Sequence, residues 1–560
     1  MASKKKFAMV AGFYDKLTAI RELRYLVLVL LVVAIANISI YWLNILIQDD
    51  YYYGLYRWRE LNPFPLMSQE TYWFVNRSLC WIAGNLNVYL ARSLILVCMI
   101  FPCAILLYSI LRKLNYPIQV ALFTATMVWI FPGQIEIPLF VNGSYTVEAM
   151  LAMLLSFWSG LNFLEDDSDG CWKWFFTTLL CQFWALNISE LIVPSTVAIV
   201  FCYLCQGKFT RKSWLLSAAL SVLTLFHTYS NILHGGRGMI HRSHPLTYKS
   251  LGNTVLAFID WCLPPTFIDY FDDNIWRKWI VFVVLSLLIG FVLGNRIFCS
   301  GLYKAKRGVR LIWRDEFVWR MVFPLLLFLL PLMVMAIAPW FNPRHAIFPA
   351  VGFYACLSFA LGELLKKHQS ILIGIIAVTL VGTVFRHQLS VEKVYAKSNR
   401  DHAQFVAFAA TRSFPANCQI VVTNMDVATS GYGYWSAGYL EYVLKRKDVF
   451  GLVGDELNMI DPFRPHDYSA GGMNGLDGNR PLFLFRKSDG MFQQLSYLLQ
   501  WKEKNPDSAY VLYRLDPETG KIERVLEGTG FESYAENCVM LAATKGVKQT
   551  DILWGGVSAF

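Results

Sequence analysis

Charged residues are scarce in this chain. Asp, Glu, Lys and Arg make up 16% of its 560 residues, whereas a soluble domain carries about 25%. The 36 glycines and 21 prolines are too few for a collagen-like or low-complexity chain. The aromatic share of 16% excludes disorder. A soluble globular enzyme is therefore not expected.

Motifs of soluble enzymes are also missing. The segment HGGRGMIHRSHP lacks the Lys-Ser/Thr pair of a phosphate-binding Walker loop. Cys202 and Cys205 form a CxxC without a second pair or a nearby His. Four histidines gather in one region, but their spacing matches no standard ligand set: His227, His234, His241 and His244. We predict no metal site and no cofactor, with a divalent metal as the weaker alternative.

Apolar residues are abundant, at 56% of the chain with a mean hydropathy of +0.41. They gather in about eleven runs long enough to suggest membrane helices. The runs cover 25–47, 88–111, 118–133, 145–164, 172–188, 189–206, 213–233, 278–298, 316–338, 345–365 and 370–385. The fold class predicted is a polytopic α-helical membrane protein. The last run is short for a span, and 172–206 is open to a single bent hairpin.

Lys and Arg in the short loops predict the orientation. With the N-terminus inside, four of five inside loops are basic, as the positive-inside rule requires. The outside loops are then 48–87, 133–145, 234–277 and 339–344.

The composition becomes polar and mixed after residue 385. We therefore divide the chain into a membrane domain, 1–385, and an extracytoplasmic α/β domain, 386–560. QIVVTN is typical of a buried strand, and YVLYRLDPETGKIERVL predicts two strands around a turn at Thr519-Gly520.

An acidic pair marks the outer end of the first run. Asp49 and Asp50 are followed at once by Tyr51, Tyr52 and Tyr53. Two adjacent carboxylates at the mouth of a membrane helix repel each other, so they are costly unless used or paired. One could act as a general base while the tyrosines flank a sugar ring. The alternative is an interfacial aromatic belt beside solvated acids.

With this acidic pair, about eleven spans and a C-terminal soluble domain, the chain resembles the GT-C superfamily of glycosyltransferases. The resemblance implies an inverting transfer from a polyprenyl-phosphate sugar at the outer face. It implies that Asp49 accepts the proton of the acceptor hydroxyl, and that Asp50 orients Asp49 or the acceptor. Family members commonly place another acid in the second outside loop.

Three acids and four basic residues complete the candidate set. The second-loop acids are Glu136 and Glu148, and Glu190 lies at another outer break. A leaving lipid phosphate needs cations close to the membrane surface. The candidates are Arg344 and His345 at a helix start, and Arg237 and Arg242 in the glycine-rich segment.

The function predicted is modification of O-antigen (lipopolysaccharide) or another cell-envelope glycan. The partners would be an undecaprenyl-type lipid-linked sugar, a glycan or glycolipid acceptor, a donor synthase and a donor flippase, with no nucleic acid. A bacterial inner membrane with a periplasmic active site is favoured. The triplets Asn76-Arg-Ser and Asn142-Gly-Ser leave an ER enzyme open. Competing functions are a lipid-linked sugar flippase or transporter, and an O-antigen polymerase or ligase.

Overall fold

The computed structural model describes most of the membrane domain and parts of the tail. The residues described are 22–37, 74–131, 141, 143–233, 246–262, 283, 284, 287, 292, 316–337, 343–410, 418–423, 449–452, 509–515 and 522–529.

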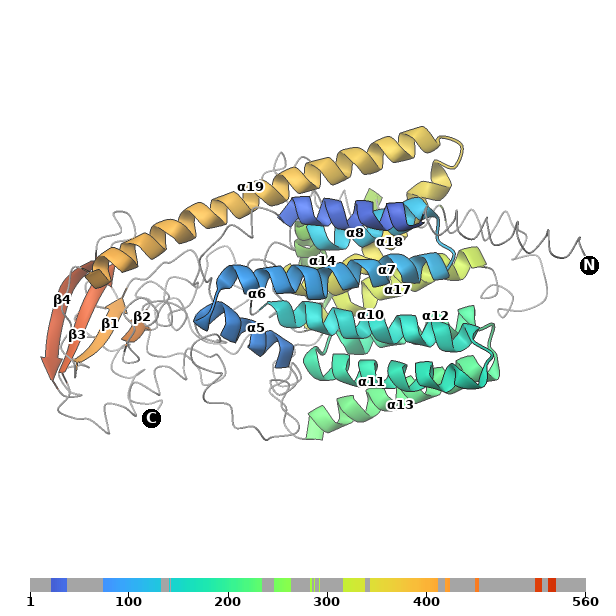
Figure 1. Cartoon of the computed structure of the whole chain (residues 1–560), viewed down its shortest axis with the longest axis horizontal. Helices are drawn as coiled ribbons and strands as arrows, with labels where there is room; N and C mark the ends of the chain where they lie inside the picture. The colour runs from blue at the N-terminus through green and yellow to red at the C-terminus, as the bar shows by residue number, and fades with distance from the viewer. Residues whose placement is uncertain are drawn as a thin grey trace, which may run out of the picture.

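The described part of the membrane domain is a bundle of helices (Figure 1). After a first helix over 22–37 come α5 (Phe74–Asn85), α6 (Val88–Ile95), the π-helix η2 (Leu96–Ile100), α7 (Phe101–Lys113), α8 (Ile118–Ile130), α10 (Ser144–Glu165), the 3-10 turn η4 (Asp169–Cys171), α11 (Trp172–Ile188), α12 (Ile192–Gln206), α13 (Arg211–Leu233), α14 (Tyr248–Cys262), α17 (Glu316–Ile337), the 3-10 turn η8 (Pro343–Ala346), α18 (Ile347–Leu364) and α19 (Gln369–Ala410).

Five helical stretches in the described residues are long and apolar enough to cross a membrane. They are Val88–Lys113, Ser144–Glu165, Glu316–Ile337, Ile347–Leu364 and Gln369–Leu389. Helices also occupy the described parts of the other expected runs; residues 38–47 of the first run and most of 278–298 lie outside the described residues. The membrane-protein class is therefore supported, whereas the number eleven stays a prediction. Between 172 and 206 the chain forms two helices, α11 and α12, separated by a short link.

Helix packing depends on small residues at close crossings. A Cβ added to Gly352 of α18 would lie 2.3 Å from the carbonyl oxygen of Pro324 in α17. A Cβ added to Gly160 of α10 would lie 2.2 Å from the Tyr203 hydroxyl of α12. Both helix pairs can approach this closely only because glycine has no side chain. Large apolar side chains cover the outside instead, for example Leu180, which is 69% exposed.

Ion pairs gather at one end of the bundle, where three expected inside loops lie. Arg112 at the end of α7 binds Glu22 of the first helix at 3.0 Å. Lys113 binds Glu165 at the end of α10. Lys212, at the start of α13, lies 2.9 Å from Asp167. These loops therefore lie at the same end of the bundle, as the alternation of the helices predicts. Which side of a membrane this end faces stays a prediction.

The longest helix, α19, leaves the bundle at the opposite end. Its 42 residues extend about 63 Å at about 1.5 Å per residue, roughly twice the thickness of a bilayer core. It runs without a break through 385 and 386, the domain boundary expected from composition. Figure 1 shows α19 passing the end of the bundle that holds α5 and α6 and reaching a β-sheet.

The sheet confirms two sequence predictions about the tail. Its strands are β1 (Cys418–Thr423), β2 (Val449–Leu452), β3 (Ala509–Leu515) and β4 (Ile522–Thr529), in the order β2-β1-β3-β4. QIVVTN contributes β1, which pairs in parallel with both neighbours. The two strands expected around Thr519-Gly520 are β3 and β4, an antiparallel pair. A complete α/β domain over 386–560 stays a prediction.

Candidate functional site

A buried carboxylate lies near the start of α10, at the end of the bundle opposite the ion-paired loops. Glu148 is only 5% exposed. Its Oε2 accepts the backbone N–H of Asn76 at 3.2 Å, and its Oε1 accepts the indole N–H of Trp184 at 3.2 Å. Each oxygen therefore faces a donor from a different helix, α5 or α11. Both partners are N–H groups, which can only donate, so both carboxylate oxygens act as acceptors here.

The position of Asn76 explains why an acid is stable here. Asn76 is the third residue of α5, and the first N–H groups of a helix have no acceptor within the helix. Their partial positive charge also favours an anion. Glu148 thus stabilises the start of α5 from another helix. Its structural role is to hold α5, the helix that follows the segment containing Asp49 and Asp50.

The side chain of Asn76 ties the first outside loop to the second. Its Nδ2 donates to Ser144 Oγ at 2.8 Å and to the carbonyl oxygen of Val141 at 3.2 Å. Asn76 is 1% exposed, so its amide is not accessible to a glycosylating enzyme in this fold. This triplet therefore gives no support to the ER alternative.

A second polar contact joins the loop before α18 to the same region. The Tyr145 hydroxyl lies 2.8 Å from His345 Nε2. Tyr145 precedes Glu148 by three residues on α10, so the two side chains share one face of that helix. His345 belongs to η8, which leads directly into α18. Segments from three of the four expected outside loops thus meet around the first turns of α10.

The structure places only some of the predicted site residues. It brings Glu148 and His345 to one region, and Arg344 precedes His345 in η8. Glu190 lies in the link between α11 and α12, where its carbonyl accepts the N–H of Val193. The remaining candidates lie outside the described residues: Asp49, Asp50, Tyr51, Tyr52, Tyr53, Glu136, Arg237 and Arg242.

Three contact residues were not predicted as site residues from the sequence, although Asn76 was noted as the start of an Asn-Arg-Ser triplet. Asn76 lies in a mixed polar stretch, and Trp184 is one aromatic residue in an apolar run. Neither has a local pattern that marks it as a partner of Glu148. Tyr145 does have a weak signal, since it lies three residues before an acid at the start of an expected span.

Metal ligands do not cluster in the described residues. No group of three His, Cys, Asp or Glu side chains there could hold an ion. Of the four histidines that gather in the sequence, His227 alone is described, buried on α13. The absence of a metal therefore stays a prediction.

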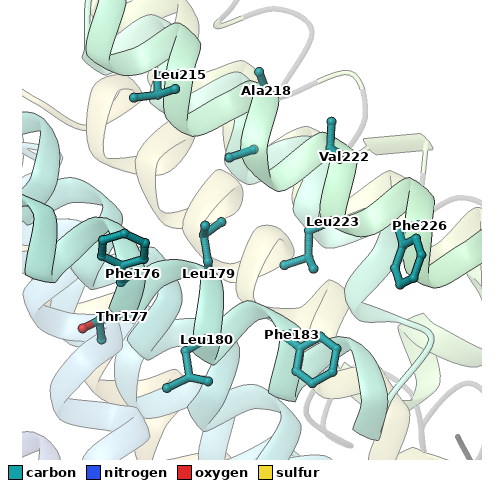
Figure 2. Close-up of a pocket in the computed structure, with 11 residues that line it drawn as sticks. Phe176, Thr177, Leu179, Leu180, Phe183, Leu215, Ala218, Val222, Leu223 and Phe226 are labelled. Atoms are coloured by element: carbon teal, nitrogen blue, oxygen red, sulfur yellow. The ribbon is translucent and has the colours of Figure 1, made fainter.

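An apolar groove of about 990 Å³ lies between α11 and α13. Figure 2 shows a row of side chains from each helix facing the groove, among them Phe183 of α11 and Phe226 of α13. Phe183 is next in the chain to Trp184, so the groove reaches the level of the Glu148 site at one end.

Comparisons with known proteins give distant likenesses only. No protein-family model matches the chain, and no curated protein does. Among solved structures, it is similar to the Archaeoglobus fulgidus oligosaccharyltransferase in a complex with Zn and sulfate. The identity is 11% and the TM-score 0.40, over 75% of this chain and 61% of that one. The chain thus spans less than two thirds of that protein.

Two further structures carry lipid phosphates. One is the archaeal oligosaccharyltransferase AglB from A. fulgidus with an inhibitory peptide and a dolichol-phosphate, at 10% identity and TM-score 0.41, covering 90% of this chain and 74% of that one. The other is ArnT from Cupriavidus metallidurans bound to undecaprenyl phosphate, at 12% and 0.44, covering 88% and 93%. At these TM-scores the likeness alone assigns neither a family nor an activity to this chain.

Proposed function

We propose that this protein is a membrane glycosyltransferase that takes a sugar from a polyprenyl-phosphate donor. The observation that supports the proposal best is the convergence of outside-loop segments on the buried carboxylate of Glu148. Charged and polar side chains gather there at one end of the bundle, whereas a transporter is expected to place them midway along its helices. An interfacial site suits a donor whose reactive group lies at the membrane surface.

In the proposed reaction, Asp49 accepts the proton of the acceptor hydroxyl and Asp50 orients it. The hydroxyl oxygen then forms a bond to the anomeric carbon as the bond from that carbon to the phosphate oxygen breaks. The sugar inverts its configuration, and polyprenyl phosphate leaves with the bonding electron pair. Glu148 acts on this reaction by fixing α5, which follows the acidic pair in the chain.

The departing phosphate requires cations. Arg344 and His345 are proposed for this role because η8 directly precedes α18, and a helix start favours an anion. The Tyr145 hydroxyl, 2.8 Å from His345, would orient the imidazole ring. Arg237 and Arg242 are proposed to assist, and Tyr51, Tyr52 and Tyr53 to flank the sugar.

The acceptor proposed is a glycan or glycolipid of the bacterial envelope, O-antigen included, at the periplasmic face of the inner membrane. The C-terminal part of the chain would face the same compartment. This proposal agrees with the course of α19, which leads the chain away from the basic loops and past the Glu148 end of the bundle (Figure 1).

Sugar transfer by purified protein in nanodiscs tests the assignment. The substrates are a panel of undecaprenyl-phosphate sugars with envelope glycolipid acceptors. We expect Asp49→Asn to lower the rate by about 10²- to 10⁴-fold, the usual contribution of a general base. The matched control is Asp167→Asn at the opposite end, where an exposed ion pair contributes little. Undiminished transfer by a folded Asp49→Asn variant would rule out the base assignment.

The product separates the competing functions. Transfer of one sugar supports the proposal, whereas transfer of a whole glycan favours a polymerase or ligase. Movement of the donor lipid across the bilayer with no product favours a transporter.

A further inference from the structure

The groove between α11 and α13 is apolar along its whole length. Its lining is carbon except for Thr177, whose hydroxyl donates to the carbonyl oxygen of Lys173 at 2.7 Å. Leu180 and Val222 line it and are 69% and 66% exposed. Apolar walls exposed to this extent suit lipid chains better than water.

Two basic residues lie at one end of the groove. On α13, Arg211 precedes Leu215 by four residues and Ala218 by seven, so all three share one face of the helix. On α11, Lys173 precedes Thr177 by four residues and Leu180 by seven, so these three also share one face of their helix. Lys173 and Arg211 are exposed and lie in the first turn of their helices. Both helix faces therefore lead from a cation into the groove of Figure 2.

In the described part of the chain, Lys173 and Arg211 form no ion pair within 4.0 Å, although the Asp166 carboxylate is an electrostatic neighbour of Lys173. Lys212 binds Asp167 Oδ1 and the carbonyl oxygen of Asp166, each at 2.9 Å. Hydrogen bonds from Ser168 lower the pKa of Asp166, and the positive charge of nearby Lys173 lowers it further. Lys173 Nζ lies 5.0 Å from the ring centre of Trp174, and no described carboxylate lies within 4.0 Å of Lys173 or Arg211.

Exposed tryptophans indicate that this end lies at a membrane surface. Trp172, which directly precedes Lys173, is 49% exposed, and Trp214, three residues after Arg211, is 56% exposed. Tryptophan concentrates at the boundary between headgroups and chains. From Leu215 to Phe226 the groove extends about 16 Å along the axis of α13, roughly half the thickness of a hydrocarbon core of about 30 Å. Its length therefore matches one leaflet, counted from the basic end.

We propose that this groove binds one anionic glycerophospholipid from the leaflet at the basic end of the bundle. The acyl chains lie between α11 and α13, and the phosphate headgroup lies against Lys173 and Arg211. Basic pockets between membrane helices on that side are suited to anionic headgroups. The headgroup end of this site lies at the opposite end of the bundle from the proposed sugar transfer, and only the far end of the groove, at Phe183, comes near the level of Trp184 and Glu148.

Native mass spectrometry of the delipidated full chain tests the site. The probes are phosphatidylglycerol and phosphatidylcholine with identical acyl chains. We expect tighter binding of phosphatidylglycerol, and about 25-fold weaker binding in the double variant Lys173→Gln/Arg211→Gln, from about 5-fold for each cation near a membrane surface. The matched control is Lys366→Gln/Lys367→Gln, a basic pair in the turn between α18 and α19, which should bind as the wild type does.

A second variant tests the chain-binding part. Ala218→Trp places a ring in the groove, and because Ala218 is exposed this ring needs no repacking of the core. We expect it to abolish binding of both phospholipids while the unfolding temperature is kept. Equal affinity for the two headgroups, or unchanged phosphatidylglycerol binding in Lys173→Gln/Arg211→Gln, would overturn the proposal. Displacement of phosphatidylglycerol by equimolar undecaprenyl phosphate would overturn it in favour of an isoprenoid occupant.

Discussion

The hydrogen bond between Trp184 and Glu148 allows a quantitative test of the site. Trp184→Phe removes the indole N–H that donates to Glu148 Oε1 at 3.2 Å and keeps an aromatic ring. Glu148→Gln removes the charge and leaves a single acceptor oxygen for two donors. A hydrogen bond to a charged group contributes about 1.5–3 kcal/mol. Because the Gln oxygen can still accept the indole N–H, the cycle measures the difference between a carboxylate and an amide acceptor, and we expect a coupling free energy of about 1 kcal/mol or more between the two substitutions.

The coupling is measured as a double-mutant cycle. The free energy of unfolding of wild type, both single variants and the double variant is obtained in mixed dodecylmaltoside and SDS micelles, followed by circular dichroism. Trp174→Phe is the matched control, because Trp174 is ten residues or about 15 Å away on α11. Its effect should add to that of Glu148→Gln within about 0.5 kcal/mol. A coupling free energy below about 0.5 kcal/mol for Trp184→Phe would contradict a carboxylate acceptor for the indole N–H.

Two further predictions concern the packing of the bundle. Gly352→Ala places a Cβ against the backbone of α17 and should lower the free energy of unfolding by about 1–3 kcal/mol, whereas Gly374→Ala, with no atom within 4 Å of the added Cβ, should not lower it. The same micelle titration measures both, and equal effects would contradict the close crossing. Asn37→Ala removes the contact of Asn37 Oδ1 with buried His387 Nε2 at 3.1 Å and should cost about 0.6–1.7 kcal/mol. No loss there would show that this contact does not hold α19 to the first helix.

The positions of the membrane helices could be predicted because they depend on local composition. A run of about 20 apolar residues has few alternatives to a spanning helix, so α10 and α17 lie close to their expected bounds. The β3–β4 hairpin was predictable for the same reason, since alternation and a turn lie within one short segment.

Contacts between distant segments could not be predicted in this way. Glu148 is 72 residues from Asn76 and 36 from Trp184, and the pairing arises from how α5, α10 and α11 pack. The acid itself could be recognised because a charge at the start of an apolar run is rare. Its partners could not, because an Asn in a polar stretch and a Trp in an apolar run are common.

The end of α19 shows a different limit of sequence reasoning. The change of composition after residue 385 marks where the surroundings of the chain change, and it does not mark the end of the helix. Residues 386–410 contain neither glycine nor proline, so nothing local interrupts the helix. The helix therefore continues to Ala410, past the expected boundary.

Release of lipid phosphate tests the proposed enzyme most directly. Purified protein is reconstituted in liposomes with undecaprenyl-phosphate sugars labelled in the sugar and an envelope glycolipid acceptor. We expect the label to appear on the acceptor with one undecaprenyl phosphate released for each sugar transferred. Label that only changes leaflet while it remains on the lipid, with no undecaprenyl phosphate released, would contradict a glycosyltransferase and identify a transporter.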